Sequence, residues 1–136
     1  PSSINHHLST MHTDITKEQF QAFAQLPIDK TLQMLNLMKF KEHIPETNRT
    51  GEEQYRAYMK AAFPFFQQSN ARIVFYGKPI ANLIGPNDLE WDKVLIVEYA
   101  TKDDFMGMIG SNGYPAEMRH LALEDSRLIF CEAITL

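Results

Sequence analysis

The sequence predicts an α+β domain in which helices cover one face of a four-stranded antiparallel sheet. After a leading helix, the 136-residue chain reads strand, helix, strand, strand, helix, strand, which is the order of a ferredoxin-like βαββαβ fold. Segments 31–40 and 93–100 are apolar on both of their alternating faces, as central strands of a covered sheet are. Right-handed crossovers place these two strands in the centre, so element order and hydrophobic pattern agree.

The N-terminal residues 1–14 are polar and show no periodicity, which predicts a flexible arm ahead of a single domain spanning 15–136. This arm contains His6, His7 and His12. No acidic or cysteine partner accompanies them at ligand spacing, so we interpret them as solvated side chains and expect no metal site.

A helix is predicted over residues 16–26. Thr16 followed by Gln19 is a capping-box pattern, in which the hydroxyl accepts from a free amide of the first turn. Phe20 and Phe23 recur at helical spacing. The helix is too short to be stable alone, so we expect these rings to dock on the domain or on a partner.

The strand at 31–40 carries one polar side chain among apolar ones, Asn36. Its neighbours on the same face are Leu32, Met34, Met38 and Phe40. A buried amide either pairs with the protein or faces a cavity. Both readings stay open, and the scarcity of free backbone partners in a sheet favours the cavity.

The middle of the chain predicts a helix over 52–69 and an edge strand over 71–85. Pro64 should kink the helix or end its regular part. Gly77 and Pro79 lie inside the apolar strand segment, where an edge position or a bulge tolerates them and a central position does not.

The last third of the chain predicts a helix capped by Thr101, a short helix over 116–123 and a closing strand over 126–134. Cys131 lies in the apolar run of that strand, so we expect a buried, inert thiol. An intramolecular disulfide is excluded because the chain has a single cysteine.

Helices that cover one face leave the second apolar face of the sheet without a partner. The least costly cover is a second copy of the same face. We therefore expect a homodimer whose two sheets close face to face into a barrel.

Four stretches resemble a known family: QMLNLMKFKE, TGEEQYRAYM, RIVFYGKPIANLIGPNDLEWDKVLIVEYATKDDFMGMI and MRHLALEDSRLI. In this order they resemble the bacterial DUF1330 family of uncharacterised proteins, from about Ile15 to the C-terminus. Membership implies the dimeric α/β barrel superfamily, which includes cofactor-free monooxygenases, isomerases, haem-using peroxidase relatives and members without known activity. Fold alone therefore does not transfer function. The matching motif positions are Asn36, Tyr55, Trp91, Asp92, Tyr114, Arg119, Asp125 and Ser126.

Composition and motifs exclude several classes of function. A net charge of -4, with 13 basic residues scattered among 17 acidic ones, argues against a nucleic-acid partner. The chain carries no phosphate loop, Rossmann fingerprint, G-x-S-x-G elbow or zinc-protease motif, so hydrolase, kinase and dehydrogenase readings lose support. We expect no cofactor. The single cysteine fits a reducing cytosol, and no apolar run approaches the length of a spanning helix, so we expect a cytoplasmic protein without a membrane partner.

The candidate ligand-binding residues are Asn36, Tyr55, Trp91, Tyr114 and Arg119. Trp91 either caps the core or stacks on a substrate, and Asp92 accepts from a turn amide. Arg119 either joins Asp125 and Ser126 in a salt bridge that locks the last strand, or binds an anion. His120 is the only histidine on a candidate helix, and we interpret it as solvent-facing rather than as a haem ligand.

Three functions stay open. The first is non-catalytic binding of a small apolar or aromatic ligand in an apolar cavity. The second is a cofactor-independent monooxygenase or isomerase in which Asn36, a tyrosine and Arg119 orient the substrate and stabilise developing negative charge. The third is a purely structural homodimer with a filled interior. The sequence does not decide whether the protein is an enzyme.

Overall fold

The computed structural model describes residues 11–136. The elements of this part of the chain are α2 (Lys17–Gln25), β1 (Leu32–Phe40), α3 (Gly51–Gln67), β2 (Ala71–Gly77), β3 (Lys93–Tyr99), α4 (Lys102–Ile109), α5 (Ala116–Ala122) and β4 (Leu123–Cys131). The strands form one antiparallel sheet in the order β2-β3-β1-β4. This is the predicted ferredoxin-like α+β fold, with the two strands that are apolar on both faces in its centre.

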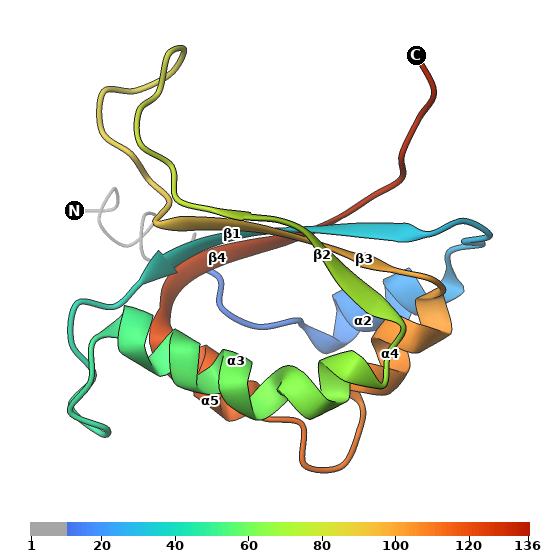
Figure 1. The fold of residues 1–136 in the computed structure, drawn as a ribbon, viewed down its shortest axis with the longest axis horizontal. Coiled ribbons are helices and arrows are strands. Elements are labelled where there is room, and N and C mark those ends of the chain that lie inside the picture. The colour runs from blue at the N-terminus through green and yellow to red at the C-terminus, as the bar shows by residue number, and fades with distance from the viewer. Residues whose placement is uncertain (1–10) are drawn as a thin grey trace.

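The helices lie on one side of the sheet and leave the other side bare (Figure 1). The connection between β2 and β3 and the C-terminal tail both project from the bare side (Figure 1). We call the covered side the inner face and the bare side the outer face. Within residues 11–136, no helix combines the length and hydrophobicity that crossing a membrane requires.

Strand β1 sends its even-numbered side chains to the inner face. Leu32, Met34 and Met38 are almost fully buried there, and Asn36 is 7% exposed. Antiparallel pairing sets Met34 beside Val97 and Asn36 beside Leu95 of β3. Side chains of paired residues share a face, so β1 and β3 together form the floor of the hydrophobic core.

Helix α3 begins at a complete capping box. The Glu53 amide donates to the Thr50 hydroxyl at 3.1 Å, and the Thr50 amide donates to the Glu53 carboxylate at 2.8 Å. Pro64 does not end the helix, which continues to Gln67. Because the proline lies in the last turn, its missing amide removes a single hydrogen bond near the end of the element.

Strand β2 is the predicted edge strand but ends at Gly77, well before residue 85. Residues 78–92 leave the sheet as a long connection, in which Ile80, Leu83 and Ile84 are 77%, 96% and 98% exposed. Pro79 explains the early end, since it has no amide with which to extend a ladder.

Strand β4 begins and ends three residues earlier than predicted. Cys131 pairs with Gln33 and lies on the outer face, where it is only partly buried. The expectation of a buried thiol is therefore wrong for this chain taken alone. A run of apolar residues does not reveal which positions of an edge strand face the helices.

Residues 12–16, which we call the strap, run along β4 and α5. The His12 amide donates to the Asp125 carboxylate at 2.9 Å, and the Ser126 amide donates to the His12 carbonyl at 2.7 Å. The arm predicted over 1–14 is thus held to the domain at its C-terminal end. His6 and His7 lie outside the described residues.

Helix α2 follows the strap and docks on the domain as predicted. Thr16 is its N-cap and accepts from the Gln19 amide at 3.1 Å. The ring of Phe23 meets those of Phe105 and Phe130 edge-on, each at a centroid distance of 5.7 Å. At the other end of the helix, Lys102 donates to the carbonyls of Ala24 and Leu26 at 2.7 and 2.8 Å, and the Leu26 carbonyl also accepts from the Ile28 amide.

Candidate functional site

A cavity of about 590 Å³ lies between the inner face of the sheet and the helices. The strap and the start of α2 close one side of it. Its apolar lining is Ile15, Phe20, Met34, Met59, Ala62, Phe63, Phe66, Ile73, Leu95, Val97, Phe105, Met108, Ile109 and Leu128. A cavity of this size is in the range of small-molecule sites, about 300–1,000 Å³.

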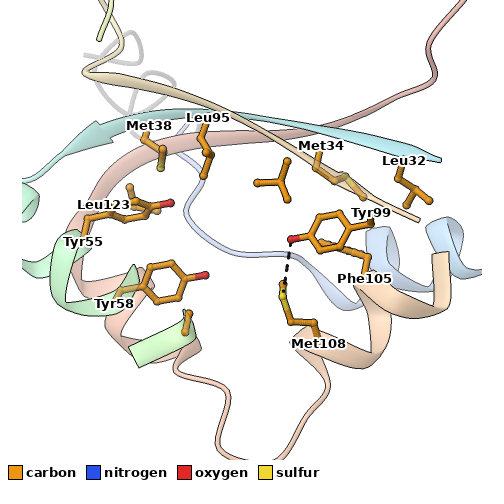
Figure 2. Packing of buried hydrophobic residues seen from close by; sticks show 13 residues of the cluster. Leu32, Met34, Met38, Tyr55, Tyr58, Leu95, Tyr99, Phe105, Met108 and Leu123 are labelled. Carbon is orange, nitrogen blue, oxygen red and sulfur yellow. Dashed lines mark hydrogen bonds between the residues drawn. The ribbon is translucent and has the colours of Figure 1, made fainter. Parts of the chain in front are cut away.

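Tyrosine hydroxyls bring polarity into this apolar space. Tyr55 and Tyr58 point inward from α3, and Tyr99 points toward them from β3 on the opposite side (Figure 2). The Tyr99 hydroxyl contacts the sulfur of Met108 at 3.9 Å, a weak acceptor. The hydroxyls of Tyr58 and Tyr114 are hydrogen-bonded to each other. The cavity therefore offers hydroxyl donors from three elements.

These tyrosines stay protonated at neutral pH. Burial is the main cause that raises the pKa of Tyr55, Tyr58, Tyr99 and Tyr114 above the ordinary value. The positive charge of Arg119 opposes this rise in each of them. A protonated phenol donates a hydrogen bond and cannot act as a base, so these groups suit an acceptor such as an oxyanion.

Arg119 enters the cavity from α5. Its guanidinium donates to the Thr13 carbonyl at 3.2 Å and to Oδ1 of Asn36 at 3.4 Å. Among residues 11–136 no carboxylate pairs with it. The predicted salt bridge to Asp125 is wrong, because Arg127 pairs with Asp125 at 2.8 Å. Arg119 lies on α5 and lines the cavity. Arg127 lies on β4, the strand that also carries Asp125.

Asn36 serves both of the roles that the sequence left open. Its amide donates to the main-chain carbonyls of Met34 at 3.4 Å and Leu95 at 3.3 Å. These are long bonds to carbonyls that already serve the sheet. Its oxygen accepts from Arg119, and the residue lines the cavity. Asn36 thus forms hydrogen bonds within the sheet and also orients the guanidinium of Arg119.

Trp91 does not join this group. Its ring lies under the guanidinium of Arg127 at 5.2 Å from the centroid, and it is absent from the cavity lining. The neighbouring Asp92 carboxylate accepts from the Phe40 amide at 2.8 Å, and the Asp92 amide donates to the Met38 carbonyl at 2.7 Å. Asp92 thus joins the start of β3 to the end of β1. Both residues have structural contacts, and Trp91 has no place in the cavity lining.

The close packing of α3, β1 and α5 depends on Gly51. Its amide donates to the Lys41 carbonyl at 2.8 Å, and the Lys41 amide donates to the Ala122 carbonyl at 3.0 Å. A Cβ at position 51 would lie 2.5 Å from backbone atoms of Lys41 and 2.6 Å from the Ala122 carbonyl. Only glycine fits there, and this contact sets Tyr55 and Arg119 on facing helices.

Four of the five predicted site residues, Asn36, Tyr55, Tyr114 and Arg119, line the one cavity. Sequence reasoning missed Tyr58 and Asp14. Tyr58 could have been found from its position one helical turn after Tyr55. Asp14 gave no signal, since it lies in a segment without periodicity.

The remaining charged groups of the lining are Asp14 and Lys17, both exposed. His120 is 41% exposed and forms a close contact with Asp14, 2.7 Å between Nδ1 and Oδ2. It is absent from the lining of the cavity. Within residues 11–136, no group of three or more His, Cys, Asp or Glu side chains is placed to hold a metal ion.

Comparison with known proteins places this chain beside proteins of unknown function. No model of a known family and no curated protein matches it. The crystal structure of RPA0582, a protein of unknown function from Rhodopseudomonas palustris, is 36% identical with a TM-score of 0.86, covering 93% of this chain and 100% of that one. The structure of methylated RPA0582 is 35% identical with a TM-score of 0.86, covering 93% and 97%.

A more distant structure is described as a dimeric protein of unknown function and ferredoxin-like fold from Bacteroides fragilis. It is 15% identical, with a TM-score of 0.46, and the match covers 76% of this chain and 96% of that one. The match to RPA0582 covers the whole of that protein, and more than a third of the aligned residues are identical. The chain therefore belongs to the same family as the Rhodopseudomonas palustris protein RPA0582, which is described as a protein of unknown function.

Proposed function

We propose that this protein binds a small apolar or aromatic organic anion in the cavity between the sheet and the helices. The observation that carries the proposal is the guanidinium of Arg119, a half-buried cation that no carboxylate neutralises among residues 11–136. A cation held in an apolar site is stabilised by an anionic ligand, because charge burial is costly without a partner.

The polar groups around Arg119 suit an oxyanion. The guanidinium has five N–H donors, and its hydrogen bonds to Thr13 and Asn36 use two of them. The hydroxyl of Tyr55 lies beside this guanidinium, which opposes the rise that burial causes in the pKa of the phenol. Arginine binds carboxylates through two parallel hydrogen bonds, so a carboxylate or an enolate oxygen would find several donors at one end of the cavity.

The rest of the cavity suits a hydrocarbon or an aromatic ring. Its walls are formed by side chains of Phe, Met, Ile, Leu and Val from seven elements and the strap. Aromatic ligands gain from edge-to-face contacts with aromatic walls, an arrangement that Tyr99 and Phe105 of the lining already adopt with each other. A bicyclic aromatic acid would place its ring here and its carboxylate at Arg119.

The experiment is a calorimetric comparison of 2-naphthoate with its uncharged isostere 2-naphthamide. We expect naphthoate to bind at least about tenfold more tightly, a difference of about 1.4 kcal/mol. Arg119→Gln should remove this preference, while Arg56→Gln, which changes an exposed arginine of α3, should keep it. Equal affinity of both ligands for the wild-type protein, or unchanged preference in Arg119→Gln, would contradict the proposal.

We propose further that a second copy of the chain covers the outer face of the sheet. The apolar side chains of that face are Leu35, Leu37, Phe75, Val94, Ile96 and Ile129. A two-fold axis sets the same patch against itself, so an apolar sheet meets an apolar sheet. The connection 78–92 and the C-terminal tail project from this side (Figure 1), where they would reach around the second copy.

The finer family assignment is also a proposal. The order of four separated motifs supports membership of the DUF1330 family, and the fold agrees with the dimeric α/β barrel superfamily that this family implies. The likeness to RPA0582 shows a relationship to that protein and names no activity.

A further inference from the structure

The strap places Asp14 at the open edge of the cavity, where its side chain is 56% exposed. His12 is bonded to β4 through Asp125 and Ser126, and the Thr13 carbonyl accepts from Arg119. The next residue, Asp14, lines the cavity. The strap has no helical or strand structure, but three of its backbone groups are hydrogen-bonded to the domain: the amide and carbonyl of His12 and the carbonyl of Thr13. These bonds fix the backbone next to Asp14.

The carboxylate of Asp14 is held through one of its two oxygens. Oδ2 contacts Nδ1 of His120 at 2.7 Å and accepts from the Thr13 hydroxyl at 3.1 Å. Oδ1 has no hydrogen-bond partner within residues 11–136. A carboxylate that is oriented through one oxygen keeps the other available for a proton.

Asp14 and Arg119 line the same cavity without neutralising each other. His120 and Arg119 are neighbours on α5, and each holds a different residue of the strap. Among the described residues no ion pair joins Asp14 to Arg119. One helix therefore arranges a base and an oxyanion-binding cation around a shared space.

We propose that Asp14 is a general base that removes a proton from the carbon next to a carbonyl group of the bound ligand. The C–H electron pair forms the carbon–carbon double bond, and the carbonyl π pair moves to the oxygen. The proton resides on Oδ1 of Asp14 and the enolate oxygen lies at Arg119. Return of the proton to oxygen gives the enol, and return to carbon restores the ketone, so no electrons leave the system.

This inference rests on the proposed anion site, because Arg119 must hold the enolate oxygen. It adds a substrate class: aromatic or apolar carbonyl compounds with an acidic α-hydrogen, for which the reaction is a keto–enol isomerisation. Asp14 is the catalytic residue, and His120 is a positioning residue that acts through it. General-base catalysis of this kind contributes about 10²–10⁴-fold in rate.

The test is exchange of the benzylic hydrogens of phenylpyruvate for deuterium, followed by proton NMR in D₂O, with phenylacetate binding measured in parallel. We expect the wild-type protein to accelerate exchange at least about tenfold over buffer. Asp14→Asn should abolish this acceleration and retain phenylacetate affinity within about twofold. Asp29→Asn, a change of an exposed aspartate outside the cavity lining, should behave as the wild type.

Two further variants test the positioning role. His120→Ala should lower kcat without changing KM, and His120→Asn, whose Nδ2 can replace the imidazole Nδ1, should restore part of kcat. Phenylacetate binding without accelerated exchange, or full exchange activity in Asp14→Asn, would overturn this inference and leave the anion site standing. Absence of phenylacetate binding to the wild-type protein would overturn both.

Discussion

The guanidinium of Arg119 donates to the side-chain oxygen of Asn36 at 3.4 Å, which joins α5 to the central strand β1 across the cavity. The two residues are 83 positions apart in the chain. The bond fixes an arginine whose other contact is a backbone carbonyl of the strap. Its consequence is a cation that is oriented by neutral groups and is free to bind an anion.

Replacing Asn36 by Leu tests this relationship. Leucine removes the acceptor of Arg119 and two long hydrogen bonds to main-chain carbonyls. Because those carbonyls keep their bonds within the sheet, we expect the free energy of unfolding to fall by only about 1 kcal/mol. Affinity for 2-naphthoate should fall several-fold, measured by calorimetry. Unchanged affinity with a loss of more than about 3 kcal/mol in urea unfolding would make Asn36 a purely structural residue.

The sequence predicted the sheet well because burial follows period two in its strands. The two strands with apolar faces on both sides are the central ones, and Thr16 and Thr101 cap the helices assigned to them. It predicted the boundaries of β2 and β4 less well. In the edge strand β2, Ile73 and Phe75 lie on opposite faces and are 46% and 52% exposed, and apolar residues continue into the following connection.

Truncating Phe23 tests the docking of α2. Its ring meets Phe105 and Phe130 but is only partly buried. We therefore expect Phe23→Ala to lower the free energy of unfolding by about 2 kcal/mol, less than the roughly 3–5 kcal/mol of a fully buried phenylalanine. Gln21→Ala, an exposed change on the same helix, is the control. Equal urea midpoints for both variants would mean that α2 is not docked in solution.

Removing the charge of Asp125 tests the anchor of the strap. Burial alone would raise the pKa of this carboxyl, but hydrogen bonds from the His12 amide and Arg127 outweigh it and lower the pKa below the ordinary value. A lowered folded-state pKa stabilises the protein above the unfolded pKa, about 3.9, and this stability is lost as the pH falls through the folded value.

Asp125→Asn should accordingly cost about 1 to 3 kcal/mol at pH 7. The difference from the wild type should hold down to about pH 5 and narrow below about pH 4, as followed by urea unfolding at each pH. Asp29→Asn, which changes an exposed side chain, should show no such dependence. A difference between Asp125→Asn and the wild type that stays constant into acid would contradict the assignment.

The dimer proposal is tested on the outer face of the sheet. Phe75 is 52% exposed there, beside Ile96 in the pairing of β2 with β3. We expect the wild-type protein to sediment as a dimer at micromolar concentration and Phe75→Glu to sediment as a monomer with unchanged circular dichroism, because a charge would be buried without a partner. Lys60→Glu on α3, exposed on the other side of the molecule, should remain dimeric. A wild-type monomer would refute the proposal.

The candidate site was only partly visible in the sequence. Asn36 and Tyr55 stand out because each places a polar group on an otherwise apolar face. The periodicity of the strand and of the helix is enough to assign them to those faces. The partners of Arg119 were not predictable, since they depend on how α5 packs against β1 and on a strap that has no regular structure. Trp91 was misleading because aromatic residues at strand starts pack on many surfaces, here on Arg127.

The most direct test of the central claim is a crystal structure of the protein with 2-naphthoate. We predict the ring among the apolar walls between the sheet and the helices. One carboxylate oxygen should lie within hydrogen-bond distance of the Arg119 guanidinium and the other near the Tyr55 hydroxyl. A naphthoate bound on the outer face of the sheet, or inside the cavity with its carboxylate turned away from Arg119, would contradict the account.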